Sequence, residues 1–124
     1  MKKKLIALFV DDEPINRLIF QKSLEEHFEV LLAESGAEGL EIIQEKRFDF
    51  IVSDYTMPDM NGLEFIGQVR EQFPQLPCFI HSALVWDEAI DHAVKSKLIV
   101  KNIPKPLDVA EMLEAVEQIM AHQG

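Results

Sequence analysis

Continuous apolar runs alternate with amphipathic stretches along this chain, and that alternation limits the possible folds more than any other feature. The runs are Leu5–Val10, Phe28–Leu32, Phe48–Val52 (interrupted only by Asp49), Pro77–Ile80 and Leu98–Val100, the last with an extension as far as Ile103. Short unbroken apolar runs are typical of strands that are buried on both faces. Because a helical pattern follows each run, the sequence predicts an α/β fold with a five-stranded parallel sheet and helices on both faces.

The helices are predicted from their first residues and their apolar stripes. Pro14 suits the first position of a helix. Ser35 and Glu38 have the spacing of a capping box at the start of the second helix. The stripe of the first helix comprises Ile15, Leu18, Ile19, Phe20 and Leu24, and the later stripes lie within 40–43, 63–69, 89–94 and 109–120.

Length and composition exclude several classes of protein. The 124 residues fit one domain, which we predict to span residues 1–124. The formal net charge of −10 disfavours direct binding to nucleic acid, because the phosphates would be repelled. The apolar run after Lys2, Lys3 and Lys4 is too short for a signal peptide, and no stretch could span a membrane. We therefore expect a cytoplasmic protein without a membrane partner.

Polar residues follow four of the predicted strands. Asp11 and Asp12 follow the first strand, Asp54 the third and Ser82 the fourth, and the fifth leads to Lys105. In an open parallel sheet, ligands bind outside the carboxyl ends of the strands. Three carboxylates, a hydroxyl and an ammonium are therefore predicted to converge at one edge of the sheet.

Three neighbouring carboxylates repel one another unless a cation or protons neutralise them. Ligand oxygens alone favour a hard cation, and Mg²⁺ suits a site with few carboxylates. One carboxylate held in line could then attack phosphorus and form an acyl phosphate. Lys105 would pair with a phosphate oxygen, and the Ser82 hydroxyl would donate a hydrogen bond to another.

Each of these residues also has a purely structural interpretation. Asp11 and Asp12 could cap a helix, and Ser82 could cap another. Asp54 could be a turn residue, and Lys105 a solvated lysine before Pro106. The functional hypothesis rests on the whole set, since each member lies at the carboxyl end of a predicted strand. His81 is left out of the site because adjacent strand residues point to opposite faces.

In the order and spacing of its motifs, the sequence resembles the response regulator receiver domains of two-component signalling. The matching segments are Val10–Glu13, Asp54–Gly62, His81–Ala83 and Lys105–Pro106. The stretch from Asp54 to Gly62 is the most specific of them. The resemblance covers essentially the whole chain and implies a flavodoxin-like sheet with strand order 2-1-3-4-5.

The resemblance also implies roles for individual residues. Asp54 would be the phosphoacceptor, and Asp11, Asp12, Asp54 and the backbone carbonyl of Thr56 would bind Mg²⁺. Ser82 would move toward the phosphate, and the Lys105–Pro106 bond would be cis. The phosphoryl donor would be a histidine kinase or a phosphotransfer protein, and phosphorylation would switch binding to a downstream output domain or protein. The domain would lose its phosphate slowly and turn over no separate substrate, so it would not be an enzyme.

One position departs from the family pattern. The family usually has Tyr or Phe three residues before the lysine, where this chain has Asn102. We therefore predict a switch that runs through the loop after Ser82 and the fourth helix, without an aromatic rotamer change. Trp86 in that loop is either a reporter of the switch or a surface aromatic.

Two alternative functions remain open. One is a binding module that keeps the fold but does not use phosphate, which the missing aromatic residue favours. The other is a phosphatase with an aspartyl nucleophile, which would need a second Asp where this chain has Thr56. The sequence does not identify the kinase, the pathway, the output, the oligomeric state or whether the protein extends beyond this domain.

Overall fold

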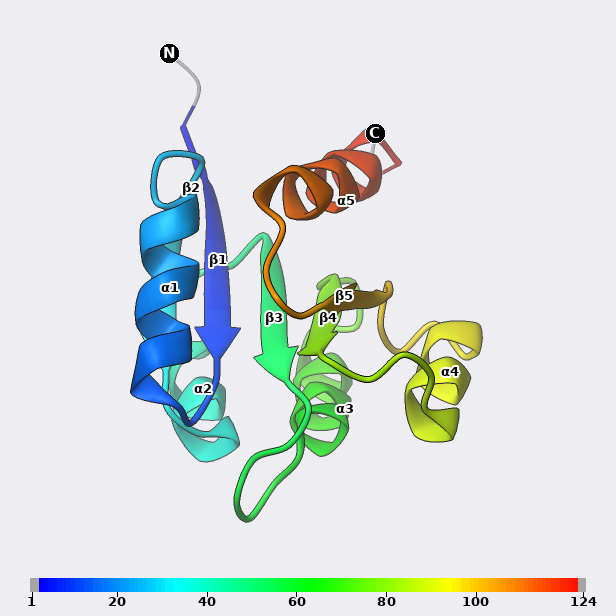
Figure 1. Cartoon of the computed structure of the whole chain (residues 1–124). Coiled ribbons are helices and arrows are strands. Elements are labelled where there is room, and N and C mark those ends of the chain that lie inside the picture. The colour runs from blue at the N-terminus through cyan, green and yellow to red at the C-terminus, as the bar shows by residue number, and fades with distance from the viewer. Residues whose placement is uncertain (1–2, 123–124) are drawn as a thin grey trace.

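The computed structural model describes residues 3–122 and contains one parallel sheet between two layers of helices (Figure 1). The strand order is β2-β1-β3-β4-β5, as the resemblance implied. The strands are β1 (Leu5–Val10), β2 (Phe28–Ala33), β3 (Phe50–Asp54), β4 (Cys78–Ser82) and β5 (Asn102–Pro104). The helices are α1 (Pro14–Leu24), α2 (Gly36–Ile42), α3 (Gly62–Gln72), α4 (Glu88–Lys95) and α5 (Val109–Ala121). None of the helices in this described part is long and apolar enough to cross a lipid bilayer.

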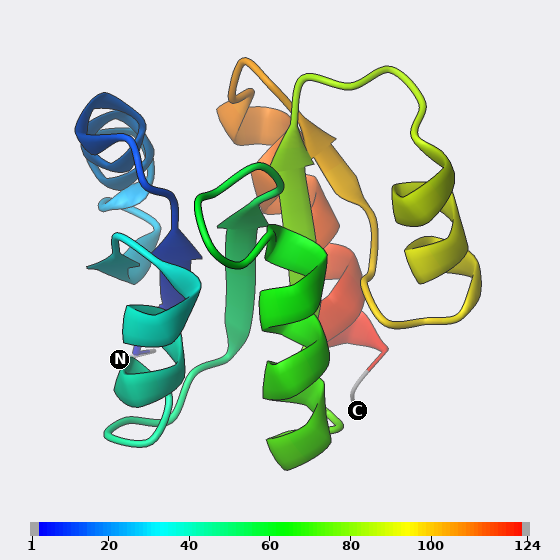
Figure 2. The same cartoon turned by 90° about the horizontal axis from the view of Figure 1, so that it is seen from below.

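Each face of the sheet carries its own hydrophobic core. On one face Phe9, Phe50 and Phe79 pack against α1 and α5 through residues such as Phe20 and Met112. On the other face, residues such as Leu8, Ile51 and Ile80 pack against α2, α3 and α4. Figure 2 shows the two helical layers on either side of the strands. Both sides of the central strands are therefore buried, which explains their unbroken apolar runs.

Two of the predicted strands, the third and the fourth, begin and end later in the chain than predicted. β3 covers 50–54 instead of 48–52, and β4 covers 78–82 instead of 77–80. Both strands continue through polar residues, Ser53 and Asp54 in β3 and Ser82 in β4, that are buried at the edge of the sheet. Asp49 precedes β3, where its Oδ2 accepts the Ile6 amide hydrogen at 2.7 Å. The apolar run marks where a strand is buried in the core and not where its hydrogen-bonded ladder ends.

The prediction for the fifth strand was wrong over Leu98–Val100. This segment connects α4 to β5, and β5 itself is only Asn102–Pro104. The Arg70 side chain on α3 donates to the Leu98 carbonyl oxygen at 2.7 Å, and Lys97 has a positive φ of 65°. Ile99 is buried and Leu98 packs against the core, whereas Val100 is exposed, so an apolar run occurs here without a strand.

The apolar stripe of α1 divides between two environments. Phe20 and Leu24 are buried in the core, whereas Ile15, Leu18 and Ile19 are 64%, 51% and 50% exposed. The sequence predicts these residues as one apolar stripe of a helix. The structure shows that half of it faces solvent near the carboxyl ends of the strands.

The helix caps agree with the predictions in part. The Ser35 hydroxyl accepts the Glu38 amide hydrogen at 3.1 Å, but the Glu38 carboxylate accepts from Glu34 and not from Ser35. The capping box predicted for α2 is therefore incomplete. A complete capping box occurs instead at α3, between Asn61 and Glu64.

Gly62, the first residue of α3, packs directly against the end of β3. A Cβ atom at this position would overlap the Asp54 carbonyl oxygen and lie 2.8 Å from Ile80 Cδ1. The Gly62 amide also donates to the Tyr55 carbonyl oxygen at 2.8 Å. The absence of a side chain lets α3 begin beside the strand end that carries Asp54.

We predict opposite effects for alanine at two glycines of α3. Gly62→Ala should lower the free energy of unfolding by roughly 1–3 kcal/mol, because the helix must shift away from β3. Gly67→Ala is the matched control, since a Cβ there meets nothing within 4 Å. It should raise stability by about 0.5–1 kcal/mol through helix propensity. Urea denaturation measures both, and a neutral Gly62→Ala would contradict the predicted overlap.

Candidate functional site

The predicted polar residues meet at the carboxyl edge of the sheet. The Lys105 ammonium donates to Asp54 Oδ1 at 2.8 Å and lies 3.8 Å from Asp11 Oδ2. Carboxylate oxygens of Asp11, Asp12 and Asp54 all lie within 4.8 Å of one another. Three carboxylates against one ammonium leave a formal charge of −2 in this cluster. A divalent cation is the simplest group that would balance it.

Asp11 is the most buried member of the cluster. Its carbonyl oxygen accepts from Arg17 on α1 at 2.8 Å, and its Oδ1 accepts the Glu13 amide hydrogen at 2.9 Å. Its Oδ2 is buried and has no hydrogen-bond partner among residues 3–122. Burial, together with the nearby Asp54 charge, raises the pKa of the Asp11 carboxyl, although Glu13 and Lys105 act in the opposite direction. The fold therefore holds this carboxylate in place at a cost in stability.

A backbone hydrogen bond connects Ser82 and Lys105. The Lys105 amide donates to the Ser82 carbonyl oxygen at 3.1 Å, next to the cis Lys105–Pro106 bond. The Ser82 hydroxyl oxygen accepts the Leu84 amide hydrogen at 3.0 Å, so its own proton is available to a ligand. Thr56 lies on the exposed loop directly after β3. Each of the six predicted site residues thus lies at or directly after a strand end at the same edge of the sheet.

His81 lies on the opposite face from Ser82, as predicted. It is buried beside Phe9 and Phe20, and its Nδ1 is 2.8 Å from the Ile103 carbonyl oxygen. Burial lowers the pKa of the His81 imidazole, with Lys105 acting in the same direction and the Ile103 hydrogen bond against it. These contacts make His81 a packed core histidine.

Two contributors to the site were not found from the sequence. Gly62 was identified only as part of a loop, and nothing marked its approach to Asp54. Arg17 was not singled out, because its contact with the Asp11 carbonyl depends on how α1 returns over β1. Asn102, which was noted, has a buried Oδ1 with no hydrogen-bond partner.

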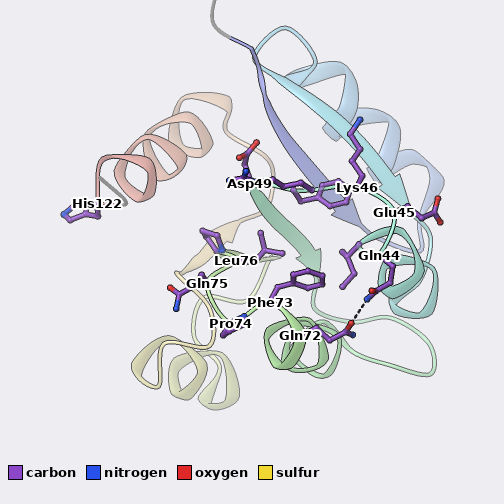
Figure 3. A pocket seen from close by; sticks show the side chains of 14 residues that line it. Gln44, Glu45, Lys46, Asp49, Gln72, Phe73, Pro74, Gln75, Leu76 and His122 are labelled. Carbon is purple, nitrogen blue, oxygen red and sulfur yellow. Dashed lines mark hydrogen bonds between the residues drawn. The ribbon is translucent and has the colours of Figure 1, made fainter.

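A large cavity lies at the other end of the sheet and is separate from this cluster. It measures about 1020 Å³ and is lined by residues that precede β3 and β4 and by the end of α3 (Figure 3). A hydrogen bond between Gln44 and Gln72 crosses one side of it. Ligands of such sheets bind at the carboxyl ends of the strands, so this cavity is not taken as the candidate site.

The fold and the acidic strand ends define a flavodoxin-like α/β domain with a candidate cation site. The chain belongs to the response regulator receiver domain family, whose model matches residues 7–117. It is therefore a receiver domain of the two-component signalling systems.

Curated relatives are longer transcriptional regulators. The chain is 32% identical over 120 residues to the DNA-binding transcriptional regulator NtrC of Escherichia coli K12, covering 94% of this chain and 25% of NtrC. It is 30% identical over 122 residues to the hydrogenase transcriptional regulatory protein HoxA of Cupriavidus necator, covering 98% of this chain and 25% of HoxA. The chain thus spans about a quarter of the length of these relatives.

Solved structures show the same fold. Chemotaxis protein CheY4 of Vibrio cholerae superposes with a TM-score of 0.85 at 28% identity, covering 94% of this chain and 98% of that one. Response regulator TrrA of Thermotoga maritima, solved in complex with Mg²⁺ and BeF, gives a TM-score of 0.80 at 27% identity, with coverage of 94% and 98%.

We predict that Asp11→Asn stabilises the domain in the absence of metal. The amide keeps the Oδ1 acceptor for Glu13 but removes a buried charge. Because burial raises the folded-state pKa of Asp11 above 3.8, the native carboxyl binds more protons than the unfolded one between the two pKa values. Stability therefore falls as the pH rises from 3.8 through the folded pKa, as the buried carboxyl becomes charged. We expect a gain of roughly 1 kcal/mol in EDTA at pH 7, which thermal unfolding would detect as a rise of about 4 °C.

The same variant should lose most of the stabilisation that added Mg²⁺ gives to the wild type. Lys46→Gln serves as the control, since its ion pair with Glu29 is remote from the cluster and exposed. An Asp11→Asn protein less stable than the wild type in EDTA would contradict this account of Asp11.

Proposed function

We propose that the domain accepts a phosphoryl group on Asp54 in a Mg²⁺-dependent reaction and thereby switches its binding to an output partner. The donor is the phosphohistidine of a histidine kinase or phosphotransfer protein. The observation that carries the proposal is the buried Asp54 carboxylate, which Lys105 holds at 2.8 Å within a cluster of three aspartates. A simple turn residue or helix cap would not need this arrangement.

The residues present fit a magnesium ion. The unpartnered Oδ2 of Asp11 is a buried acceptor without a donor, and the carboxylates of Asp12 and Asp54 lie near enough to share one ion with it. Mg²⁺ prefers such oxygen ligands and keeps several waters. The Thr56 backbone carbonyl is proposed as a further ligand. When bound, the ion would supply charge neutralisation for the carboxylates and the incoming phosphoryl oxygens.

The remaining groups have complementary tasks in the transfer. One Asp54 oxygen forms a bond to phosphorus while the P–N bond to the donor imidazole breaks, and the electron pair leaves with the imidazole nitrogen. Lys105 turns from Asp54 to a phosphoryl oxygen, which needs little movement because its Nζ already lies at the acceptor. The Ser82 hydroxyl donates to a second oxygen. These contacts to the transferred group are electrostatic and positional, as expected for phosphoryl transfer.

The domain is proposed as a phosphoacceptor that slowly hydrolyses its own acyl phosphate and turns over no separate substrate. The similarity to TrrA, which was solved with Mg²⁺ and BeF, supports this use of the site. The expected cytoplasmic location, the single-domain span of 1–124 and a downstream output domain or protein remain part of the proposal. We propose no direct binding of nucleic acid by this acidic chain.

A phosphate-independent binding module is the second candidate. It is favoured by Asn102, which stands where an aromatic residue would be expected and leaves its buried Oδ1 without a partner. The intact charge cluster at Asp54 favours the phosphoacceptor, because a domain that never binds phosphate or metal gains nothing from burying the Asp11 carboxylate among like charges.

The exposed half of the α1 stripe is the proposed docking surface for the phosphohistidine protein. Ile15, Leu18 and Ile19 are each at least half exposed, and Ile19 also borders the hollow that contains Lys105 and Pro106. Apolar side chains beside the acceptor suit a partner that must deliver a histidine to Asp54 and exclude water while doing so.

The first test of the function is intact mass after incubation with acetyl phosphate and Mg²⁺. We expect a single phosphoryl adduct on the wild type that requires Mg²⁺ and is absent in Asp54→Asn. Lys105→Ala should reduce adduct formation by at least about tenfold, as loss of a positioned charge on the transferred group does. If the wild type binds Mg²⁺ but forms no adduct, the binding-module hypothesis replaces this one.

The docking surface is tested with a protein donor. Leu18→Ala combined with Ile19→Ala should slow transfer by roughly tenfold from the histidine kinase that labels the wild type fastest in a panel, since two buried contacts are lost. Labelling by acetyl phosphate should be unchanged. Val100→Ala, another exposed apolar residue on the α4–β5 segment, is the control. Equal slowing with both donors would show damage to the site and would contradict a docking role.

A further inference from the structure

The residue after the phosphoacceptor reaches the start of a helix far along the chain. The Tyr55 hydroxyl donates to Asp87 Oδ1 at 3.5 Å, across a separation of 32 residues. The Tyr55 ring packs against the core cluster under α2, α3 and α4, and its carbonyl oxygen accepts from Gly62. Both the backbone and the ring of this residue are therefore fixed by contacts near Asp54.

Asp87 is the N-cap of α4. The Oδ1 atom that accepts from Tyr55 also accepts the Ile90 amide hydrogen at 3.0 Å. One carboxylate oxygen therefore caps the first turn of the helix and connects it to the acceptor segment. Losing such a cap destabilises the start of a helix, so contacts at Asp87 affect the whole first turn.

Beyond its cap, α4 has few buried residues. Its buried residues are Ile90 and Ala93, whereas α3 buries Gly62, Phe65, Ile66 and Val69. Elements with few buried contacts open and shift at the lowest free-energy cost. Figure 1 shows α4 at the end of the long β4–α4 connection, beyond β5.

That connection is attached near the site at both of its ends. At its beginning the Ser82 hydroxyl oxygen accepts from the Leu84 amide, and at its end Asp87 accepts from Tyr55. Between these points Leu84, Val85 and Trp86 are 45%, 104% and 68% exposed. The two attachments, and not burial of the loop, hold it in place.

We propose that Tyr55 is a positioning residue that holds the amino end of α4 to β3 when Asp54 is phosphorylated. The inference rests on the proposed function. A phosphoryl group that takes the Ser82 hydroxyl draws its oxygen away from the Leu84 amide, and the first attachment of the loop is lost. The Tyr55–Asp87 hydrogen bond then becomes the attachment that determines where α4 begins, while Leu84–Trp86 rearrange.

No hydrogen bond through Asn102 Oδ1 on β5 replaces the Tyr55–Asp87 hydrogen bond in the described residues. Asn102 lies opposite Ile80 in the β4–β5 register, and Ile80 packs in the same cluster as Ile90 of α4. The Asn102 side chain therefore faces the α4 side of the sheet, but its Oδ1 has no hydrogen-bond partner in the described residues. Tyr55, directly after β3, supplies the aromatic connection to α4 on this face.

The test compares amide hydrogen exchange in α4 with and without Mg²⁺ and beryllofluoride. In Tyr55→Phe, exchange of the first turn at Ile90 and Asp91 should rise about tenfold relative to wild type in the liganded state, the effect of losing one hydrogen bond. Without ligand the rise should be less than about threefold, because the Ser82–Leu84 attachment remains. Since Trp86 is the only tryptophan, its fluorescence anisotropy gives a second readout of the same difference.

Two substitutions of Asp87 separate the link from the cap. Asp87→Asn keeps both the cap and an acceptor for Tyr55, and it should behave as wild type. Asp87→Ser keeps a capping hydroxyl but is too short to serve Tyr55 as well, and it should reproduce Tyr55→Phe. The double variant of Tyr55→Phe with Asp87→Ser should add little to either alone.

Equal increases in exchange with and without ligand would make Tyr55 merely structural and would overturn the proposal. No increase in the liganded state would overturn it as well. Intact mass after acetyl phosphate treatment separates these results from failure of the proposed function. A wild type that forms no adduct removes both proposals, whereas a normal adduct with unchanged exchange removes only this one.

Discussion

Repulsion among three carboxylates at one edge of the sheet is the constraint on which the rest of the site depends. Lys105 compensates one charge at Asp54, and the Asp11 carboxylate is left buried with an unpartnered oxygen. A fold keeps such a cost only where the surrounding structure enforces it. Here the Glu13 amide, the Arg17 side chain and the strand β1 hold Asp11 from three sides. This arrangement is the reason for proposing a cation at the cluster, because a cation would offset the repulsion among the three carboxylates.

The sheet topology determines where the charged residues meet, and the local sequence at each strand end supplies them. Parallel strands place Asp11, Asp54 and Ser82 along a single edge although they are far apart in the chain. Gly62 lets α3 start against the Asp54 carbonyl, and the capping box of Asn61 and Glu64 fixes that start. The acceptor therefore lies between a rigid strand and a well-capped helix, whereas the loop after Ser82 has no comparable support.

The strand-end residues could be predicted from the sequence because the period of buried strands and the position of polar residues are both local signals. Asp11, Asp12, Asp54, Ser82 and Lys105 meet as expected for that reason. The predictions that were wrong concern features that depend on tertiary contacts. Leu98–Val100 is as apolar as a strand, but it forms the connection between α4 and β5, where Arg70 donates to the Leu98 carbonyl oxygen. The exposed half of the α1 stripe and the approach of Gly62 to Asp54 likewise arise only when neighbouring elements are in place.

The loop after Ser82 joins the chemistry of the site to the least-buried helix, and its polar contacts decide how it can respond. Ser82 Oγ accepts from the Leu84 amide in this structure, and it would leave that amide if the side chain moved toward a phosphoryl group on Asp54. A release at this end changes the surface that carries Leu84, Val85 and Trp86, since burial does not hold these side chains. The response reaches α4 only if something still connects the helix to the acceptor strand. In a chain with Asn102 on β5, the carboxylate of Asp87 would provide that connection under our proposal, because it both caps α4 and accepts from the Tyr55 hydroxyl.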